Sequence, residues 1–146
     1  MKKVMIFGTF DILHSGHENY IKQARELGET IVAIIARDKT VQIIKGEKAK
    51  HNEKERLKNI IDSGLIDEAY LGNLKDKTKI IKTHNPQIIA LGYDQFAFTF
   101  TLEKMIIEEN LDIKVIRLKP FRPDTFKSSI LKAQEKEKIA LTNNHE

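Results

Sequence analysis

A turn that contains two glycines and two histidines constrains this chain more than any other feature. The turn spans residues 8–17 and reads GTFDILHSGH. The run VMIF before it predicts a buried strand, and residues 18–27 after it carry apolar side chains at helical spacing. The turn therefore joins a strand to a helix. There, glycine lets the backbone approach a bound group and the helix start offers N–H groups to an anion.

His14 and His17 stand three residues apart in this turn. Both side chains can donate hydrogen bonds to phosphate oxygens at the start of the helix. The alternative is that one histidine caps the helix and the other is an ordinary surface or core residue. Because both histidines and both glycines directly follow a strand, we favour phosphate binding, with Gly8, Thr9 and the backbone N–H of Phe10 as further nucleotide contacts.

The string G-T-F-D-x-L-H-x-G-H resembles the signature of the cytidylyltransferase-like nucleotidyltransferases. This superfamily includes glycerol-3-phosphate cytidylyltransferase, phosphopantetheine adenylyltransferase and the archaeal FAD synthases. The motif is long and specific for the superfamily, but it does not fix the substrate.

Length and composition predict one domain over residues 1–146, with about the last ten residues frayed. The chain is 40% hydrophobic and 32% charged, as in ordinary globular proteins. It contains no cysteine, which excludes disulfides, thiolate catalysis and Cys-ligated zinc. No apolar run approaches the length of a membrane span and no signal peptide is recognised, so we expect a cytoplasmic protein without a membrane partner.

The net charge of +4 and the pI near 9.2 indicate a mildly basic surface that attracts polyphosphate substrates. Lysine is mixed with glutamate along the whole chain, and no nucleic-acid-binding motif or dense basic block is present. We therefore expect small-molecule partners and no nucleic acid.

Strand-like and helix-like stretches alternate along the chain. Strands are predicted at residues 3–7, 30–36, 68–71, 88–91 and 113–118. Helices are predicted at residues 17–27, 53–63 and 74–84, within 101–110, and from Ser128, with a polar loop over 37–52. This alternation predicts an α/β fold with a Rossmann-like, doubly wound sheet of five mainly parallel strands. We expect the strand order 3-2-1-4-5.

In such a sheet, ligands bind at the carboxyl ends of the strands where the strand order reverses. The histidine turn follows the first strand, and a second glycine-containing turn, residues 92–95, follows the fourth. The two turns are expected to flank the binding crevice. Gly92 is assigned to the nucleotide, and Asp94 to the ribose or the acceptor.

Nucleotidyl transfer needs aligned polyanions and neutralised charge, and no general base or covalent intermediate, because the attacking phosphate is already an anion. We assign His14 and His17 to the α- and β-phosphates. The resemblance implies that a lysine in the loop after the second strand also contacts the phosphates. Lys45 is the first choice, with Lys48 and Lys50 as near substitutes.

Asp11 and Arg56 carry alternative interpretations. Asp11 either orients the loop or acceptor, or helps to hold Mg²⁺ or another divalent cation. The resemblance implies that Arg56, which follows Glu55, points toward the acceptor phosphate, and the alternative is an exposed helix ion pair.

Residues 122–130, RPDTFKSSI, resemble the second family signature, R-T-E-G-I-S-[ST]-[ST]-x-[IL]. The resemblance implies that Ser128 and Ser129 bind the β- and γ-phosphates and that Arg122 binds the acceptor. A helix cap also explains Ser128. The chain lacks the glycine, has Asp124 for glutamate, and has Lys127 before the serines, which weighs against a cytidine nucleotide.

Phe96, Phe98 and Phe100 alternate after the second turn. Such a stripe is more often core packing or a dimer contact. The sharper interpretation is an aromatic wall, including Phe96, for a flat acceptor such as isoalloxazine.

Several strings are similar to the archaeal FAD synthases, namely ARDKTV at 36–41, LGYDQ at 91–95 and the final Ser-Ser pair. The similarity implies transfer of AMP from ATP to FMN, with FAD and pyrophosphate as products, by a homodimer. The alternative is transfer from CTP to glycerol 3-phosphate or another small phosphate, including a sugar phosphate of an envelope pathway. A non-catalytic nucleotide-binding module is disfavoured because both histidines are present.

Overall fold

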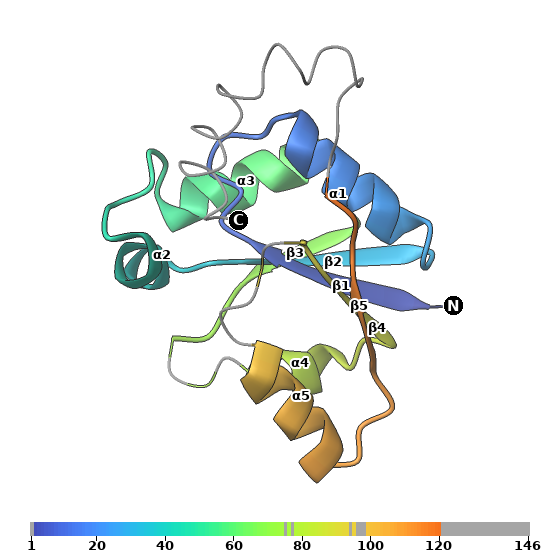
Figure 1. Ribbon diagram of the computed structural model, residues 1–146. Coiled ribbons are helices and arrows are strands. Elements are labelled where there is room, and N and C mark those ends of the chain that lie inside the picture. Colours follow the sequence, from blue (N-terminus) through green and yellow to red (C-terminus); the bar gives the residue numbers. More distant parts are fainter. Residues whose placement is uncertain (1, 75, 77, 94, 96–98, 121–146) are drawn as a thin grey trace.

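The computed structural model describes residues 2–74, 76, 78–93, 95 and 99–120, which build an α/β fold around one sheet (Figure 1). The five strands lie in the order β3-β2-β1-β4-β5, and every neighbouring pair is parallel. The predicted class and strand order are confirmed. The strands are β1 (Lys3–Gly8), β2 (Thr30–Ile35), β3 (Glu68–Leu71), β4 (Ile88–Leu91) and β5 (Lys114–Arg117).

Helices cover both faces of the sheet. They are α1 (Ser15–Arg25), α2 (Asp38–Lys45), α3 (Glu53–Asp62), α4 (Lys79–His84) and α5 (Thr99–Glu108). In Figure 1, α1 and α3 lie on one face, α4 and α5 lie on the other, and α2 lies beyond the end of β2. None of the described helices has the length and apolar character needed to cross a bilayer.

The central strands are apolar on both faces because each face is covered by helices. Side chains alternate along a strand, so Val4 and Ile6 of β1 join the core under α1 and α3, whereas Met5 joins the core under α4 and α5. The same division holds for Ala33 and Val32 in β2. This packing fixes the register that places the ends of β1, β2 and β4 at a common edge.

The polar loop predicted at 37–52 is wrong over its first half, because residues 38–45 form α2. Val41 is buried with 2% exposure and supplies the apolar contact that holds this short helix to the fold. The helix ends where Gly46 adopts a left-handed φ of 81°, which glycine adopts without strain. Lys45 is therefore the last residue of a helix and not a loop residue.

The helix predicted at 74–84 begins only at Lys79. Just before it, the Asp76 carboxylate accepts hydrogen bonds from both the backbone N–H and the hydroxyl of Thr78. Such a local turn competes with helical hydrogen bonding and delays the start of the helix.

Candidate active site

The two histidines of the turn cap α1 and lie against each other. His14 is the N-cap, and its Nδ1 accepts a hydrogen bond from the Gly16 N–H at 3.0 Å. Nδ1 of His17 accepts from the His14 N–H at 3.3 Å, and the ring centroids are 4.0 Å apart. Because each Nδ1 accepts, each neutral ring carries its proton on Nε2. The capping alternative is thus observed for His14.

Both glycines of the turn are required by neighbouring rings. A Cβ at Gly16 would lie 2.8 Å from Cε1 of His14, and a Cβ at Gly8 would lie 2.7 Å from Cε2 of Phe10. Phe10 itself has a left-handed φ of 51° and is 1% exposed. A bulky residue in this region is strained, and such strain clusters at functional sites.

His17 is a buried residue of this turn. It is 7% exposed, and its ring centroid lies 5.3 Å from that of Phe10. Burial lowers the pKa of His17 to about 3, and the charges of His14 and Lys45 act in the same direction. His17 is therefore a neutral hydrogen-bond donor at physiological pH. Because the Lys45 charge acts on it, the end of α2 lies close to the histidine pair.

The low pKa of His17 predicts acid sensitivity. The unfolded imidazole binds a proton near pH 6.5 and the folded one only near pH 3, so the unfolded chain binds more protons between these values. Stability from this group is fully present above pH 6.5 and falls as the pH drops. At pH 4.5 the loss is about 2–3 kcal/mol. The free energy of unfolding, measured in urea at pH 7.5 and 4.5, should fall by this amount less in His17→Gln than in the unmodified chain.

Asp11 holds the segment that follows α2. Its Oδ2 accepts from the Lys50 N–H at 2.7 Å, and its Oδ1 accepts from the His51 N–H at 2.9 Å. Burial raises the pKa of Asp11, but these backbone hydrogen bonds outweigh it and keep the pKa below its usual value. The loop-orienting role predicted for Asp11 is the one that these contacts support.

A metal role fits these residues poorly. Both oxygens of Asp11 already accept backbone N–H groups. Across the part of the chain that the structure describes, no three His, Cys, Asp or Glu side chains gather into a cation site. The predicted Asp11 metal contact stays a prediction without support from its surroundings, and no step is derived through it.

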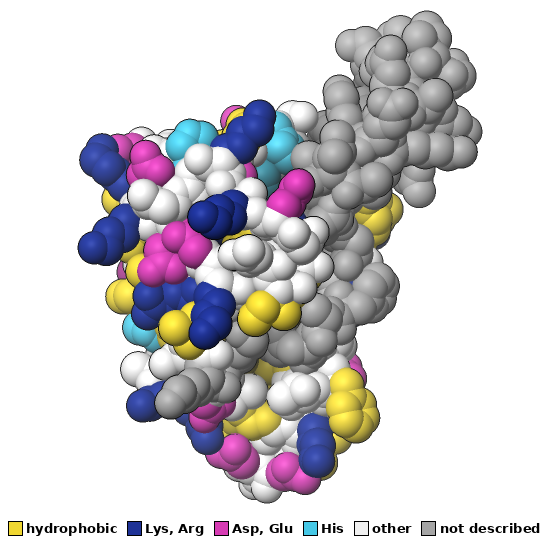
Figure 2. Space-filling view, turned by 90° about the vertical axis from the view of Figure 1, so that its left-hand side faces the viewer, with side chains coloured by type: hydrophobic (Ala, Val, Ile, Leu, Met, Phe, Trp, Pro, Cys, Tyr) yellow, Lys and Arg dark blue, Asp and Glu magenta, His cyan; other side chains and the backbone are white. Residues whose placement is uncertain are grey.

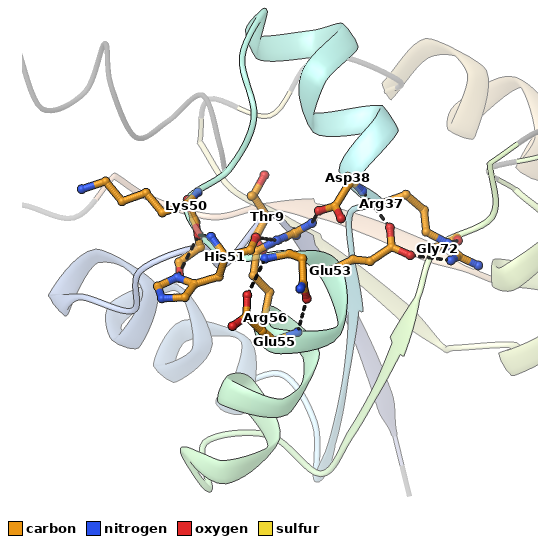
Figure 3. Close-up of polar contacts among 11 residues, drawn as sticks. Thr9, Arg37, Asp38, Lys50, His51, Glu53, Glu55, Arg56 and Gly72 are labelled. Atoms are coloured by element: carbon orange, nitrogen blue, oxygen red, sulfur yellow. Dashed lines mark hydrogen bonds and ion pairs between the residues drawn. The ribbon is translucent and has the colours of Figure 1, made fainter.

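Arg56 is a buried cross-link and not an exposed helix residue (Figure 3). Its side chain is 0% exposed, so the exposed ion-pair alternative is wrong. Nη1 donates to the Thr9 carbonyl at 2.9 Å, Nε donates to the His51 carbonyl at 3.0 Å, and Nη2 donates to Oδ1 of Asp38 at 2.8 Å. The guanidinium therefore faces protein acceptors on three segments. The predicted contact with the acceptor phosphate stays a prediction.

The turn after β4 is tied to the end of β1, as expected for two turns that flank one crevice. The Gly92 N–H donates to Oε1 of Gln95 at 2.8 Å, and Nε2 of Gln95 donates to the Phe7 carbonyl at 2.7 Å. The Tyr20 hydroxyl donates to the Ala90 carbonyl at 2.7 Å and lies 3.2 Å from Oε1 of Gln95. These contacts join the two strands at the point where the strand order reverses.

Three residues of this junction were not predicted as site residues. Gln95 stands in the turn already assigned to the site, and Tyr20 follows His17 by one helical turn, so their positions were the available signals. Arg117 at the end of β5 donates to the carbonyls of Gly92 and Gln95 at 2.9 and 2.8 Å. Nothing in the sequence distinguishes it from other surface arginines.

Five predicted site residues lie outside the described residues, namely Asp94, Phe96, Arg122, Ser128 and Ser129. Phe98 of the aromatic stripe lies outside them as well. Phe100 is described and is 77% exposed on α5, so core packing is wrong for this member of the stripe.

The face where the strands end is mixed in charge. Figure 2 looks onto the side of the molecule where the strands end, and it shows lysine and arginine interspersed with acidic side chains, with histidines toward the top. Anions are therefore attracted to this face by individual lysine and arginine side chains, and not by a continuous basic surface.

A parallel sheet of order 3-2-1-4-5 with a two-histidine turn at its reversal point is the arrangement that the resemblance to the nucleotidyltransferase class implies. Comparison with known sequences agrees. The chain belongs to the Cytidylyltransferase-like family, whose pattern it matches over residues 5–139.

Relatives with assigned names cover almost the whole chain. The FAD synthase of Methanothermus fervidus is 42% identical over 128 residues, which covers 86% of this chain and 88% of the relative. The FAD synthase of Methanobrevibacter smithii is 42% identical over 137 residues, which covers 88% and 86%.

Solved structures show the same fold. A structure described as the lipopolysaccharide core biosynthesis protein from Thermoplasma volcanium has a TM-score of 0.78 at 35% identity and covers 84% of this chain and 99% of its own. Pantothenate synthetase from Thermus thermophilus has a TM-score of 0.59 at 13% identity, covering 84% and 57%, a likeness of fold alone.

Proposed function

We propose that this protein is an FMN adenylyltransferase that transfers AMP from ATP to the phosphate of FMN, giving FAD and pyrophosphate. The observation that carries the proposal is the 42% identity to archaeal FAD synthases over nearly the full length of both chains. The position of the histidine turn at the reversal point of the sheet supports the same assignment.

The site residues supply hydrogen bonds and charge, and not acid–base chemistry. An oxygen of the FMN phosphate attacks the α-phosphorus of ATP, and the bond to the bridging oxygen of pyrophosphate breaks. The neutral His17 ring and the His14 ring donate hydrogen bonds to phosphate oxygens, and the Lys45 ammonium balances charge that grows on the leaving group. Because the attacking phosphate is an anion, no general base is needed.

A divalent cation, Mg²⁺ or a similar ion, is part of the proposal as a partner of the triphosphate. When bound, it would neutralise phosphate charge. We propose that it arrives with ATP, because Asp11 already accepts two backbone hydrogen bonds.

The reaction is tested by incubating the purified protein with ATP, Mg²⁺ and FMN and separating the flavins. We expect FAD and pyrophosphate in equal amounts. A matched panel offers CTP with glycerol 3-phosphate and offers ATP or CTP with sugar phosphates, because one similar structure is described as a lipopolysaccharide core biosynthesis protein. Turnover of CTP alone would replace the proposal by the cytidylyl alternative. Tight nucleotide binding without pyrophosphate release from any pair would indicate a non-catalytic module.

The proposal also includes a cytoplasmic homodimer that acts on small molecules. Light scattering at the assay concentration tests the dimer, and a monomeric mass with full activity would contradict it.

A further inference from the structure

The segment between β2 and α3 is fastened at both of its ends. At its start, Nη2 of Arg56 donates to the Asp38 carboxylate at 2.8 Å, and the Asp38 N–H donates to Oε1 of Glu53 at 2.8 Å. At its end, the Asp11 carboxylate receives the N–H groups of Lys50 and His51. We call these four side chains, Asp11, Asp38, Glu53 and Arg56, the clamp; Figure 3 labels the last three.

The clamp connects this segment to the histidine turn, residues 8–17. Asp11 belongs to that turn, and Arg56 donates to the Thr9 carbonyl in the same turn at 2.9 Å. The Arg56 guanidinium also donates to the His51 carbonyl at 3.0 Å, next to the N–H that Asp11 receives. One buried cation and one carboxylate thereby join the turn to both ends of residues 38–51.

The start of α3 sets the direction of Arg56. The Asn52 side chain accepts from the Glu55 N–H at 2.8 Å, and Glu55 accepts in return from the Asn52 N–H at 2.9 Å. This capping box fixes the first turn of the helix immediately before Arg56. The guanidinium is fully buried and donates to three protein acceptors.

Lys45 is the residue of this segment that we assign to the reaction. It ends α2 between the two anchors and is half-buried, and Gly46 then turns the chain back toward Asp11. Without the anchors, a short helix with one buried apolar residue, Val41, would have little to hold it in place.

We propose that Asp11 and Arg56 are positioning residues that clamp α2 and residues 46–51 onto the histidine turn and so hold Lys45, the last residue of α2, in place. This inference rests on the proposed function, since Lys45 is given a role in adenylyl transfer. It assigns neither residue to the substrate or to a metal. Asp11 and Arg56 act on the reaction only through the place of the Lys45 ammonium.

A double-mutant cycle tests this dependence. In the unmodified chain, Asp11→Asn should lower kcat/KM for FAD formation on the order of 10- to 100-fold, because one oxygen that accepts a backbone N–H becomes an amide donor. In a Lys45→Ala background, the same change should cost less than about threefold. Equal losses in both backgrounds would overturn the proposal and indicate that Asp11 contacts the substrate or the cation directly.

Hydrogen exchange tests the clamp without any assay of turnover. In Asp11→Asn, amide exchange in residues 38–51 should accelerate by about tenfold or more, while the strands keep their protection. Unchanged exchange in this segment would contradict the clamp even if activity falls. If the protein makes no FAD, the proposed function fails, and the exchange result still decides the clamp.

Asp67→Asn is the matched control. The Asp67 carboxylate also receives a backbone N–H, that of Ile31, at 2.8 Å, and it binds Arg25, but it lies at the amino ends of the strands. We expect activity within about twofold and unchanged exchange in residues 38–51. Asp38→Asn weakens the Arg56 anchor, so it should lower kcat/KM and accelerate exchange in residues 38–51 as Asp11→Asn does. If Asp38→Asn lowered kcat/KM equally with and without Lys45→Ala, that result would also contradict the clamp.

Discussion

Replacing His17 with alanine is expected to lower kcat/KM for FAD formation by about 10³-fold. The ring is 7% exposed beside Phe10, and it carries its donor proton on Nε2 because Nδ1 accepts the His14 N–H. Alanine removes the donor and the cap contact together. His17→Gln keeps a neutral N–H donor on a side chain of similar reach, so it should recover about tenfold of the loss. Steady-state kinetics with FMN and ATP measure both changes.

Comparing His17→Ala with His17→Gln separates two roles of the ring, hydrogen-bond donation and proton transfer. If His17 exchanged protons during the reaction, glutamine would be as inactive as alanine, and that result would contradict the donor role. His84→Ala is the control, because His84 stacks on Tyr70 at the end of α4 with a centroid distance of 4.2 Å. It should retain full activity. Circular dichroism should show a folded sheet in all three variants.

The fold was predictable from the sequence because its determinants are local. Strands of four to six residues alternate with helical segments, and this alternation predicts a parallel, doubly wound sheet with right-handed crossovers. The polar segment after β2 was misjudged for a physical reason. Only Val41 of α2 is buried, and Ile43 and Ile44 of the same helix are exposed, so the helix depends on contacts with distant residues.

Site residues were predictable from the sequence only where they belong to a recognisable motif. His14 and His17 lie against each other with ring centroids 4.0 Å apart, and the Lys45 charge acts on His17, but the roles of all three toward phosphate stay predictions. The place of Arg56 was not predictable, because a charged residue beside a glutamate looks like any exposed helix pair. Its burial depends on carbonyls of residues 9 and 51, which only the tertiary structure brings together.

Lys45→Ala should be the second most damaging change, with a loss in kcat/KM of about 10²-fold. Lys45 is half-buried at the end of α2 and its charge acts on His17, whereas Lys48 is exposed two residues beyond Gly46. Lys48→Ala should therefore change kcat/KM by less than about threefold. Lys45→Arg keeps the charge but not the compact ammonium, and we expect a partial loss of about tenfold.

The order of these variants decides which cation serves the phosphates. Because the ammonium balances charge that grows as pyrophosphate leaves, the loss in Lys45→Ala should appear mainly in kcat and less in KM for ATP. A loss confined to KM would mean that Lys45 binds ATP equally well before and during transfer. A larger loss in Lys48→Ala than in Lys45→Ala would move the cation beyond Gly46, and the clamp would then position a different residue.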